Sequence, residues 1–115
     1  MERKLKFWKA EEEAGLLDSA QWPRLNYTEC IDGYVEAVEG DPLQTFKCKN
    51  VDLYDFINHA TLGSPTSDSQ LRTGSTIWGW TDSESGREFT AVGMFEGTAF
   101  VEILSEGSLL PLGFL

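Results

Sequence analysis

Two tryptophans, Trp78 and Trp80, occupy alternate positions in an apolar run and could form a binding surface. Alternate residues of a strand point to the same face of a sheet, so the two indole rings would lie side by side. Such a pair can serve as an aromatic platform for a sugar or a peptide, or as a large core plug between this sheet and the next. Core packing is the interpretation we favour.

The loop after these tryptophans places Asp82 and Glu84 two residues apart and ends at Gly86. Alternating oxygen ligands suit calcium, but the pattern is short and lacks the downstream bidentate acid of an EF-hand. Hairpin turns use the same residue types for backbone reasons, so we expect an ordinary turn. We assign Asp82 and Glu84, with the two tryptophans, to the candidate binding platform. Arg87 is placed to form a surface ion pair with Glu84 or Glu88.

His59 is the only histidine of the chain, and we expect it to be a polar residue near the end of a helix or strand. Residue counts do not exclude a Ser-His-Asp site, but nothing places the three together and no Gly-x-Ser-x-Gly motif is present. One histidine and two cysteines at these spacings do not supply a zinc site, and no glycine-rich phosphate loop is present. We therefore predict no catalytic residue, no metal site and no cofactor.

Cys30 and Cys48 are the only cysteines, and their even number and modest spacing permit one disulfide, with two buried thiols as the alternative. Asn26 begins an Asn-Tyr-Thr tripeptide, the acceptor pattern for N-glycosylation, just before Cys30. Such tripeptides often arise by chance. Together the two features point to an extracellular or cell-surface location.

Charge and hydropathy limit the kinds of partner that the chain can bind. Nineteen acidic residues against nine basic ones give a formal net charge of -10. Such a surface repels phosphate backbones, so we expect no nucleic-acid binding, whereas a cation, a basic partner or simple solubility fits better. No stretch approaches the roughly eighteen apolar residues of a membrane-spanning helix. The basic start lacks an apolar central region, so no signal peptide is visible.

The elements that position these residues are clearest in the carboxyl-terminal third. Short loops that end in glycine separate four apolar runs, at 76–80, 87–95, 98–104 and 108–115. Such loops join antiparallel neighbours because glycine reaches positive φ without steric cost. Four strands in about forty residues are the size of one β-propeller blade. Both faces of the middle strands carry apolar groups, so we expect neighbours on both sides of this sheet.

The amino-terminal part is less regular. Residues 1–22 predict a partial helix that Pro23 ends. We expect an extended arm with turns at 24–41 and a short strand at 42–47. Residues 50–57 could form either a short helix, capped by Asn50 or Asp52, or a strand. A polar loop is expected from Gly63 to Gly74. The predicted fold is therefore mainly β, with one four-stranded antiparallel meander and an irregular, partly helical N-terminal arm.

Several segments match one known family in order and spacing. They are CKNVDLYDFI at 48–57, IWGWTD at 77–82 followed through SES by GREFTAVG at 86–93, EGTAFVEI at 96–103, and the closing PLGFL at 111–115. Through them, residues 30–115 resemble the amino-terminal part of the choice-of-anchor B family, whose members carry LVIVD repeats.

This resemblance implies a β-propeller-like protein, extracellular or at the cell surface, in a family with no established catalytic residues. The family's amino-terminal cysteine pair matches Cys30 and Cys48, which implies a disulfide. Residues 1–29 lie outside the match, the usual signal peptide is not seen, and the chain ends after what would be the first blade. We therefore expect an extension at 1–29, a disulfide-linked arm and loop at 30–75, and a blade at 76–115.

Three functional hypotheses follow. The leading one is a non-enzymatic interaction module, in which the Cys30–Cys48 disulfide fastens the arm across one blade and the protein or glycan partner is unknown. The second is a fragment of a propeller hydrolase or lyase, whose site would need further blades and could use Asp82 or His59. The third is a self-associating structural subunit, because open sheet edges and uncovered blade faces invite association.

Overall fold

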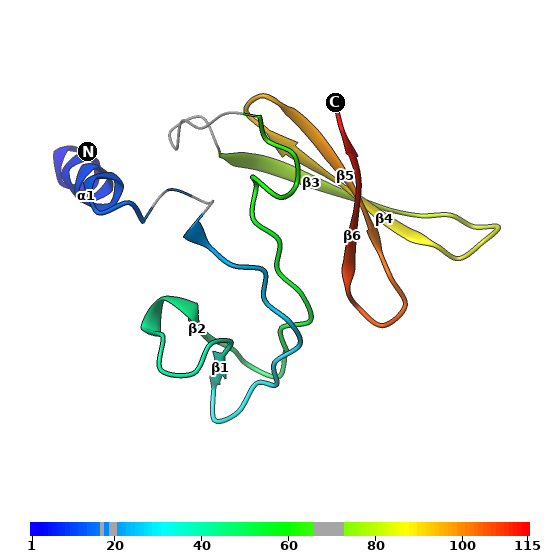
Figure 1. Cartoon of the computed structure of the whole chain (residues 1–115), viewed down its shortest axis with the longest axis horizontal. Coiled ribbons are helices and arrows are strands. Elements are labelled where there is room, and N and C mark those ends of the chain that lie inside the picture. Colours follow the sequence, from blue (N-terminus) through cyan, green and yellow to red (C-terminus); the bar gives the residue numbers. More distant parts are fainter. Residues whose placement is uncertain (17, 19–20, 66–72) are drawn as a thin grey trace.

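The computed structural model describes residues 1–16, 18, 21–65 and 73–115. As predicted, the chain is mainly β, with one four-stranded antiparallel sheet and an N-terminal helix (Figure 1). In chain order the elements are α1 (Glu2–Glu13), β1 (Tyr34–Glu36), the 3₁₀ helix η2 (Pro42–Gln44), β2 (Thr45–Lys47), β3 (Gly74–Thr81), β4 (Glu88–Met94), β5 (Gly97–Ile103) and β6 (Leu109–Phe114).

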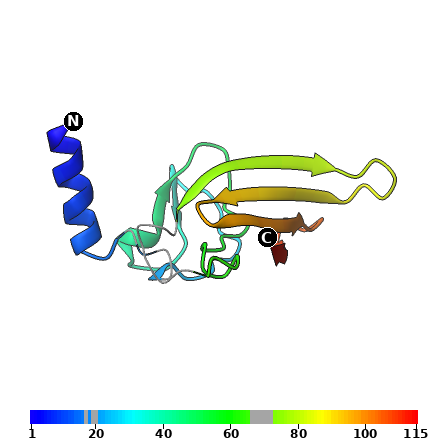
Figure 2. The same cartoon turned by 90° about the horizontal axis from the view of Figure 1, so that it is seen from above.

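Strands β3 to β6 pair in sequence order and form the predicted meander, with β3 at one edge (Figure 2). Gly86 and Gly107 take positive φ values of 71° and 90° in their turns, as expected. Gly97 does not take a positive φ, so the prediction is wrong for that loop. A Cβ on Gly97 would collide with the carbonyl oxygen of Leu115, so this glycine permits a close approach of two chain segments.

The core lies on one face of the sheet, where the segment around residues 57–62 crosses it. Its buried members are each at most 8% exposed: Ile57, Leu62, Met94, Ala99 and Val101. The register places Ala99 opposite Val92 on this face, so β4 and β5 supply its centre. One face of the sheet is therefore covered by the chain itself, as its apolar pattern requires.

Helix α1 ends earlier than predicted. The helix stops at Glu13, and Gly15 follows with a φ of 74°, so glycine rather than Pro23 terminates it. No residue of α1 is buried. Residues 17 and 19–20 of the predicted helical stretch lie outside the described residues, as do residues 66–72 of the predicted polar loop. Neither helix in the described part of the chain has the length and apolar character needed to cross a membrane.

Only half of the predicted strand at 42–47 is a strand. Pro42–Gln44 forms the single turn η2, and β2 begins at Thr45 and pairs with β1. Proline suits a first helical turn because its φ is already helical and its missing N–H needs no partner there. The Asp41 carboxylate caps the turn by accepting a hydrogen bond from the Leu43 amide at 2.9 Å.

Residues 50–57 form neither the predicted helix nor a regular strand. Asn50 lies in a turn with a φ of 57°. The Asp52 carboxylate accepts a hydrogen bond from the Cys30 amide at 2.9 Å and caps no helix. The stretch is extended and makes two isolated antiparallel bridges with the preceding chain, Leu53 with Thr28 and Phe56 with Leu25.

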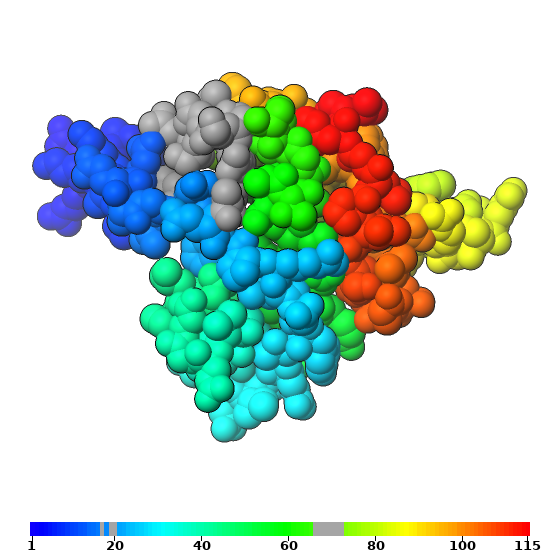
Figure 3. Space-filling model, in the orientation of Figure 1, coloured from blue at the N-terminus to red at the C-terminus, as the bar shows by residue number. Residues whose placement is uncertain are grey.

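Cys30 and Cys48 form the predicted disulfide, with Cα atoms 6.0 Å apart. The bridge lies within the arm, at the base of the β1–β2 hairpin, where the Cys48 amide donates to the Gly33 carbonyl at 3.0 Å. The prediction that it fastens the arm across the sheet is therefore wrong. That link is made by Asp55, whose carboxylate binds both Arg24 and the Leu109 amide. Figure 3 shows the green segment that follows Asp55 lying against the red strand β6.

Candidate functional site

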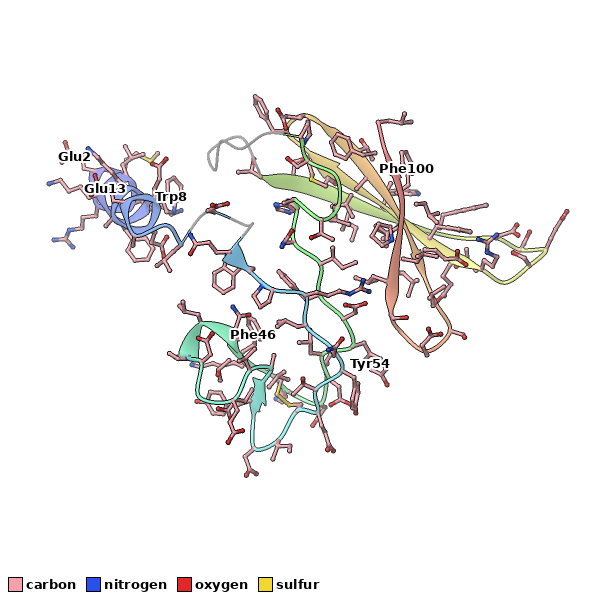
Figure 4. The ribbon with its side chains drawn as sticks, viewed as in Figure 1. Glu2, Trp8, Glu13, Phe46, Tyr54 and Phe100 are labelled. Carbon is pink, nitrogen blue, oxygen red and sulfur yellow. A yellow bond between two sulfur atoms is a disulfide. The ribbon has the colours of Figure 1, made fainter. Side chains whose placement is uncertain are left out.

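The face of the sheet opposite the core carries an apolar groove of about 390 Å³. We call this surface the aromatic face and define it by six residues that line the groove: Trp78, Trp80, Phe89, Ala91, Phe100 and Leu112. Strand register brings them together, because Trp78 lies opposite Ala91, which in turn lies opposite Phe100. Figure 4 shows Phe100 on the sheet, well away from Phe46 and Tyr54 of the arm.

The two tryptophans share one face, as their alternation predicts. Trp80 stacks on Phe89 across the β3–β4 pair, with ring centroids 5.4 Å apart and planes 23° apart. Trp78 is 75% exposed and Trp80 is 58% exposed. No segment of the described chain therefore covers them, and they do not belong to the core that this chain forms by itself. The favoured core-plug interpretation would require another sheet.

The groove offers few polar groups to a ligand. Thr90 and Val101 also border the groove, but alternation along their strands points their side chains to the core face, so neither adds a polar side chain to the aromatic face. The remaining lining side chains are aromatic or aliphatic. A surface of this kind favours apolar packing over hydrogen-bonded recognition.

An ion pair lies beside the aromatic face. The Arg87 guanidinium donates to both carboxylate oxygens of Glu102, at 2.8 and 2.7 Å, and its carbon lies 5.0 Å from the Phe89 ring centre. These hydrogen bonds lower the pKa of Glu102 and raise that of Arg87. The predicted pairing of Arg87 with Glu84 or Glu88 is wrong. Cross-strand register explains the difference, since Glu102 lies opposite Phe89, which is two residues after Arg87 and therefore on the same face of the sheet.

Asp82 organises the β3–β4 turn. Its carboxylate accepts hydrogen bonds from the Ser85 hydroxyl and from the Ser85 amide at 3.1 Å, and these bonds lower the pKa of Asp82. Its own amide donates to the Arg87 carbonyl at 2.8 Å. This is the ordinary turn that the sequence predicts. Glu84 is exposed in the same turn, and in the described ranges no three acidic, His or Cys side chains are grouped to hold a metal ion.

The other predicted site residues lie apart from the aromatic face. His59 approaches Gly74 at the start of β3, whereas Asp82 follows the end of that strand, so the two are not brought together. Asn26 is exposed on the arm, where a glycan would find space. Its glycosylation stays a prediction. Phe89, Phe100 and Leu112 complete the aromatic face, and only the two tryptophans among its members could be singled out from sequence.

Compared with known proteins, the chain matches no family model, no curated protein and no solved structure. The resemblance to the choice-of-anchor B family therefore stays a prediction that rests on the segments quoted above.

Proposed function

We propose that this chain is a non-enzymatic protein-interaction module whose aromatic face packs against a second β-sheet. The observation that carries the proposal is the 75% and 58% exposure of Trp78 and Trp80 above an apolar groove. Covering both indole rings would contribute roughly 5 kcal/mol of transfer free energy before the costs of association. A surface of this kind is characteristic of an interface.

A sheet suits this surface better than a glycan does. Sheets pack face to face through apolar side chains, whereas sugar recognition also needs free hydrogen-bonding groups. The Arg87 guanidinium and the Glu102 carboxylate, which lie beside the aromatic face, hydrogen-bond to each other. The neighbouring polar groups thus already have partners, which favours a protein over a sugar.

The family resemblance suggests which sheet packs on the aromatic face and in what kind of protein. The second sheet would be the next blade of an LVIVD-repeat β-propeller, in an extracellular or cell-surface protein. Two features support that location: the Cys30–Cys48 disulfide, since disulfides persist in oxidising compartments, and the exposed acceptor residue Asn26.

Site-specific photo-crosslinking tests the proposal. Benzoylphenylalanine replaces Phe100, which lies two strands from the free edge of β3, and the protein is irradiated in its native host. We expect one major adduct that maps to an apolar β-strand of the same or another polypeptide. The matched control places the same probe at Phe7 of α1, an exposed aromatic position away from the sheet (60% exposed). Adducts that are as scattered from Phe100 as from Phe7, or that contain only glycan, would contradict the proposal.

A further inference from the structure

The free edge of β3 points to a second interaction. We propose that β3 pairs antiparallel with β3 of a second copy of this chain, so that two four-stranded sheets join into one continuous sheet about a two-fold axis. This goes beyond the proposed function, because it uses the edge of the sheet and leaves the aromatic face to its own partner.

The first observation is that β3 is exposed along its whole length. All eight of its residues, Gly74–Thr81, are exposed, whereas β4 and β5 each contain buried residues. Within the described residues, β3 pairs with β4 alone. No other described segment therefore pairs with the outer edge of β3, and an added strand would extend the sheet at this position.

Alternate backbone N–H and C=O groups of β3 point away from β4. The Asp82 amide donates to the Arg87 carbonyl, so residue 82 faces β4. Hydrogen-bonded and outward-facing residues alternate along an antiparallel strand. The backbone N–H and C=O groups of Ile77, Gly79 and Thr81 therefore point away from β4, where a further strand could bind them.

The second observation is that the two edges of the sheet differ in the features that prevent pairing with another strand. Natural sheets blunt their free edges with proline, charged side chains or bulges. The β6 edge carries Pro111 and a register shift beside Val101. β3 has neither a proline nor a charged residue, and its only irregularity lies at its start, between Gly74 and Thr76. The β3 edge thus has the features of a strand that pairs.

The sequence of β3 is self-complementary, which favours β3 of a second copy as the strand that pairs with it. A two-fold axis at Trp78 places each Ile77 opposite the second copy's Gly79 on one face. On the other face it places each Trp80 opposite the second copy's Thr76. The two Trp78 side chains meet each other at the axis on that same face, as an aromatic cross-strand pair. Ile77 and Trp80 each meet a smaller side chain, and β3 carries no charged residue, which suits cross-strand packing in an isologous dimer.

The charge of the chain predicts how dimerisation depends on salt concentration. Each copy has a formal net charge of -10, so two copies repel at long range while the paired strands are uncharged. Salt screens the repulsion and strengthens apolar burial. Dimerisation should therefore tighten as salt rises, whereas an association carried by ion pairs would weaken.

Sedimentation velocity over a concentration series tests the proposal, with Gly79→Pro as the variant and Gly79→Ala as its control. A Cβ at Gly79 meets no atom within 4 Å, so alanine fits, and an edge strand whose N–H points outward is the place in a sheet where proline is tolerated. Proline removes the outward N–H and leaves the hydrogen bonds between β3 and β4 intact. We expect the wild type and Gly79→Ala to form dimers, and Gly79→Pro to weaken the association constant by about tenfold or more. A wild-type protein that stays monomeric, or a folded Gly79→Pro that dimerises as well as Gly79→Ala, would overturn the proposal.

Amide hydrogen exchange tests the same pairing without any substitution. On raising the protein concentration, exchange should slow at the amides of Ile77, Gly79 and Thr81, while that of Trp78, already bonded to β4, changes little. Equal rates for the three outward amides at low and high concentration would contradict the dimer. Neither experiment depends on the partner of the aromatic face, so the two proposals can fail separately.

Discussion

The carboxylate of Asp55 accepts a hydrogen bond from the backbone amide of Leu109 at 2.8 Å and so joins the arm to the first residue of β6. The same carboxylate accepts from the Arg24 guanidinium at 2.6 Å, and its side chain is only 4% exposed. A buried carboxylate is tolerated because a charged donor and an amide satisfy it together. Asp55 is thus the polar link between three segments far apart in sequence.

Removing this link should destabilise the fold. Asp55→Ala leaves the Leu109 amide without its acceptor and leaves Arg24 with only the Leu109 carbonyl, and we expect a loss of about 2 kcal/mol in the free energy of unfolding. Arg24→Ala should cost less, since its side chain is 48% exposed. Urea denaturation followed by circular dichroism measures both. Equal stability of Asp55→Ala and the wild type would show that the link contributes nothing.

The stabilisation by Asp55 should depend on pH. Burial raises the pKa of Asp55, but hydrogen bonds from Arg24 and the Leu109 amide outweigh it and hold that pKa below its ordinary value. The stabilisation is therefore present above the unfolded pKa of about 4 and is lost as pH falls through the folded pKa. The stability gap between the wild type and Asp55→Asn should shrink in acid. A gap that is constant or widens on acidification would contradict this assignment.

The disulfide should stabilise the arm. Cys30 and Cys48 are 18 residues apart, and a loop of this size is worth about 3 kcal/mol on the chain-entropy estimate. The Cys30→Ser, Cys48→Ser double variant should lose about that much, and protein from an oxidising host should show no reactive thiol after non-reducing denaturation. Two reactive thiols in that material would refute the bridge.

The aromatic face should contribute little to the stability of the isolated chain. Trp78→Ser and Trp80→Ser remove exposed rings, so each should cost less than about 1 kcal/mol. Val101→Ala, which opens a space at a residue only 2% exposed, should cost about 2 kcal/mol. Thermal and chemical denaturation compare the three. Tryptophan variants as damaging as Val101→Ala would mean that the face is core and not an interface.

Local patterns in the sequence predicted the local features. Alternation and glycine-ended loops predicted the order of β3 to β6, and the spacing of Trp78 and Trp80 predicted their shared face. The disulfide was permitted by residue count and implied by resemblance.

The long-range polar contacts could not be predicted. Asp55 and Arg24 are 31 residues apart, and Arg24 and Leu109 are 85 apart, so no periodicity links them. The same holds for Arg87, whose partner Glu102 is fixed by register and not by proximity in the chain. Two acidic residues, Asp52 and Asp55, interrupt the apolar stretch at 51–57, and that pattern does not tell which of them is buried.

Whether the aromatic face packs on a second sheet is decided by the yield of the Phe100 crosslink in the presence and absence of the two tryptophans. If the aromatic face packs on a second sheet, the Trp78→Ser, Trp80→Ser variant should fold normally and lose about nine-tenths of the adduct, a tenfold weakening that corresponds to about 1.4 kcal/mol. A folded variant that gives the wild-type adduct in wild-type yield would show that the two tryptophans do not pack on a second sheet.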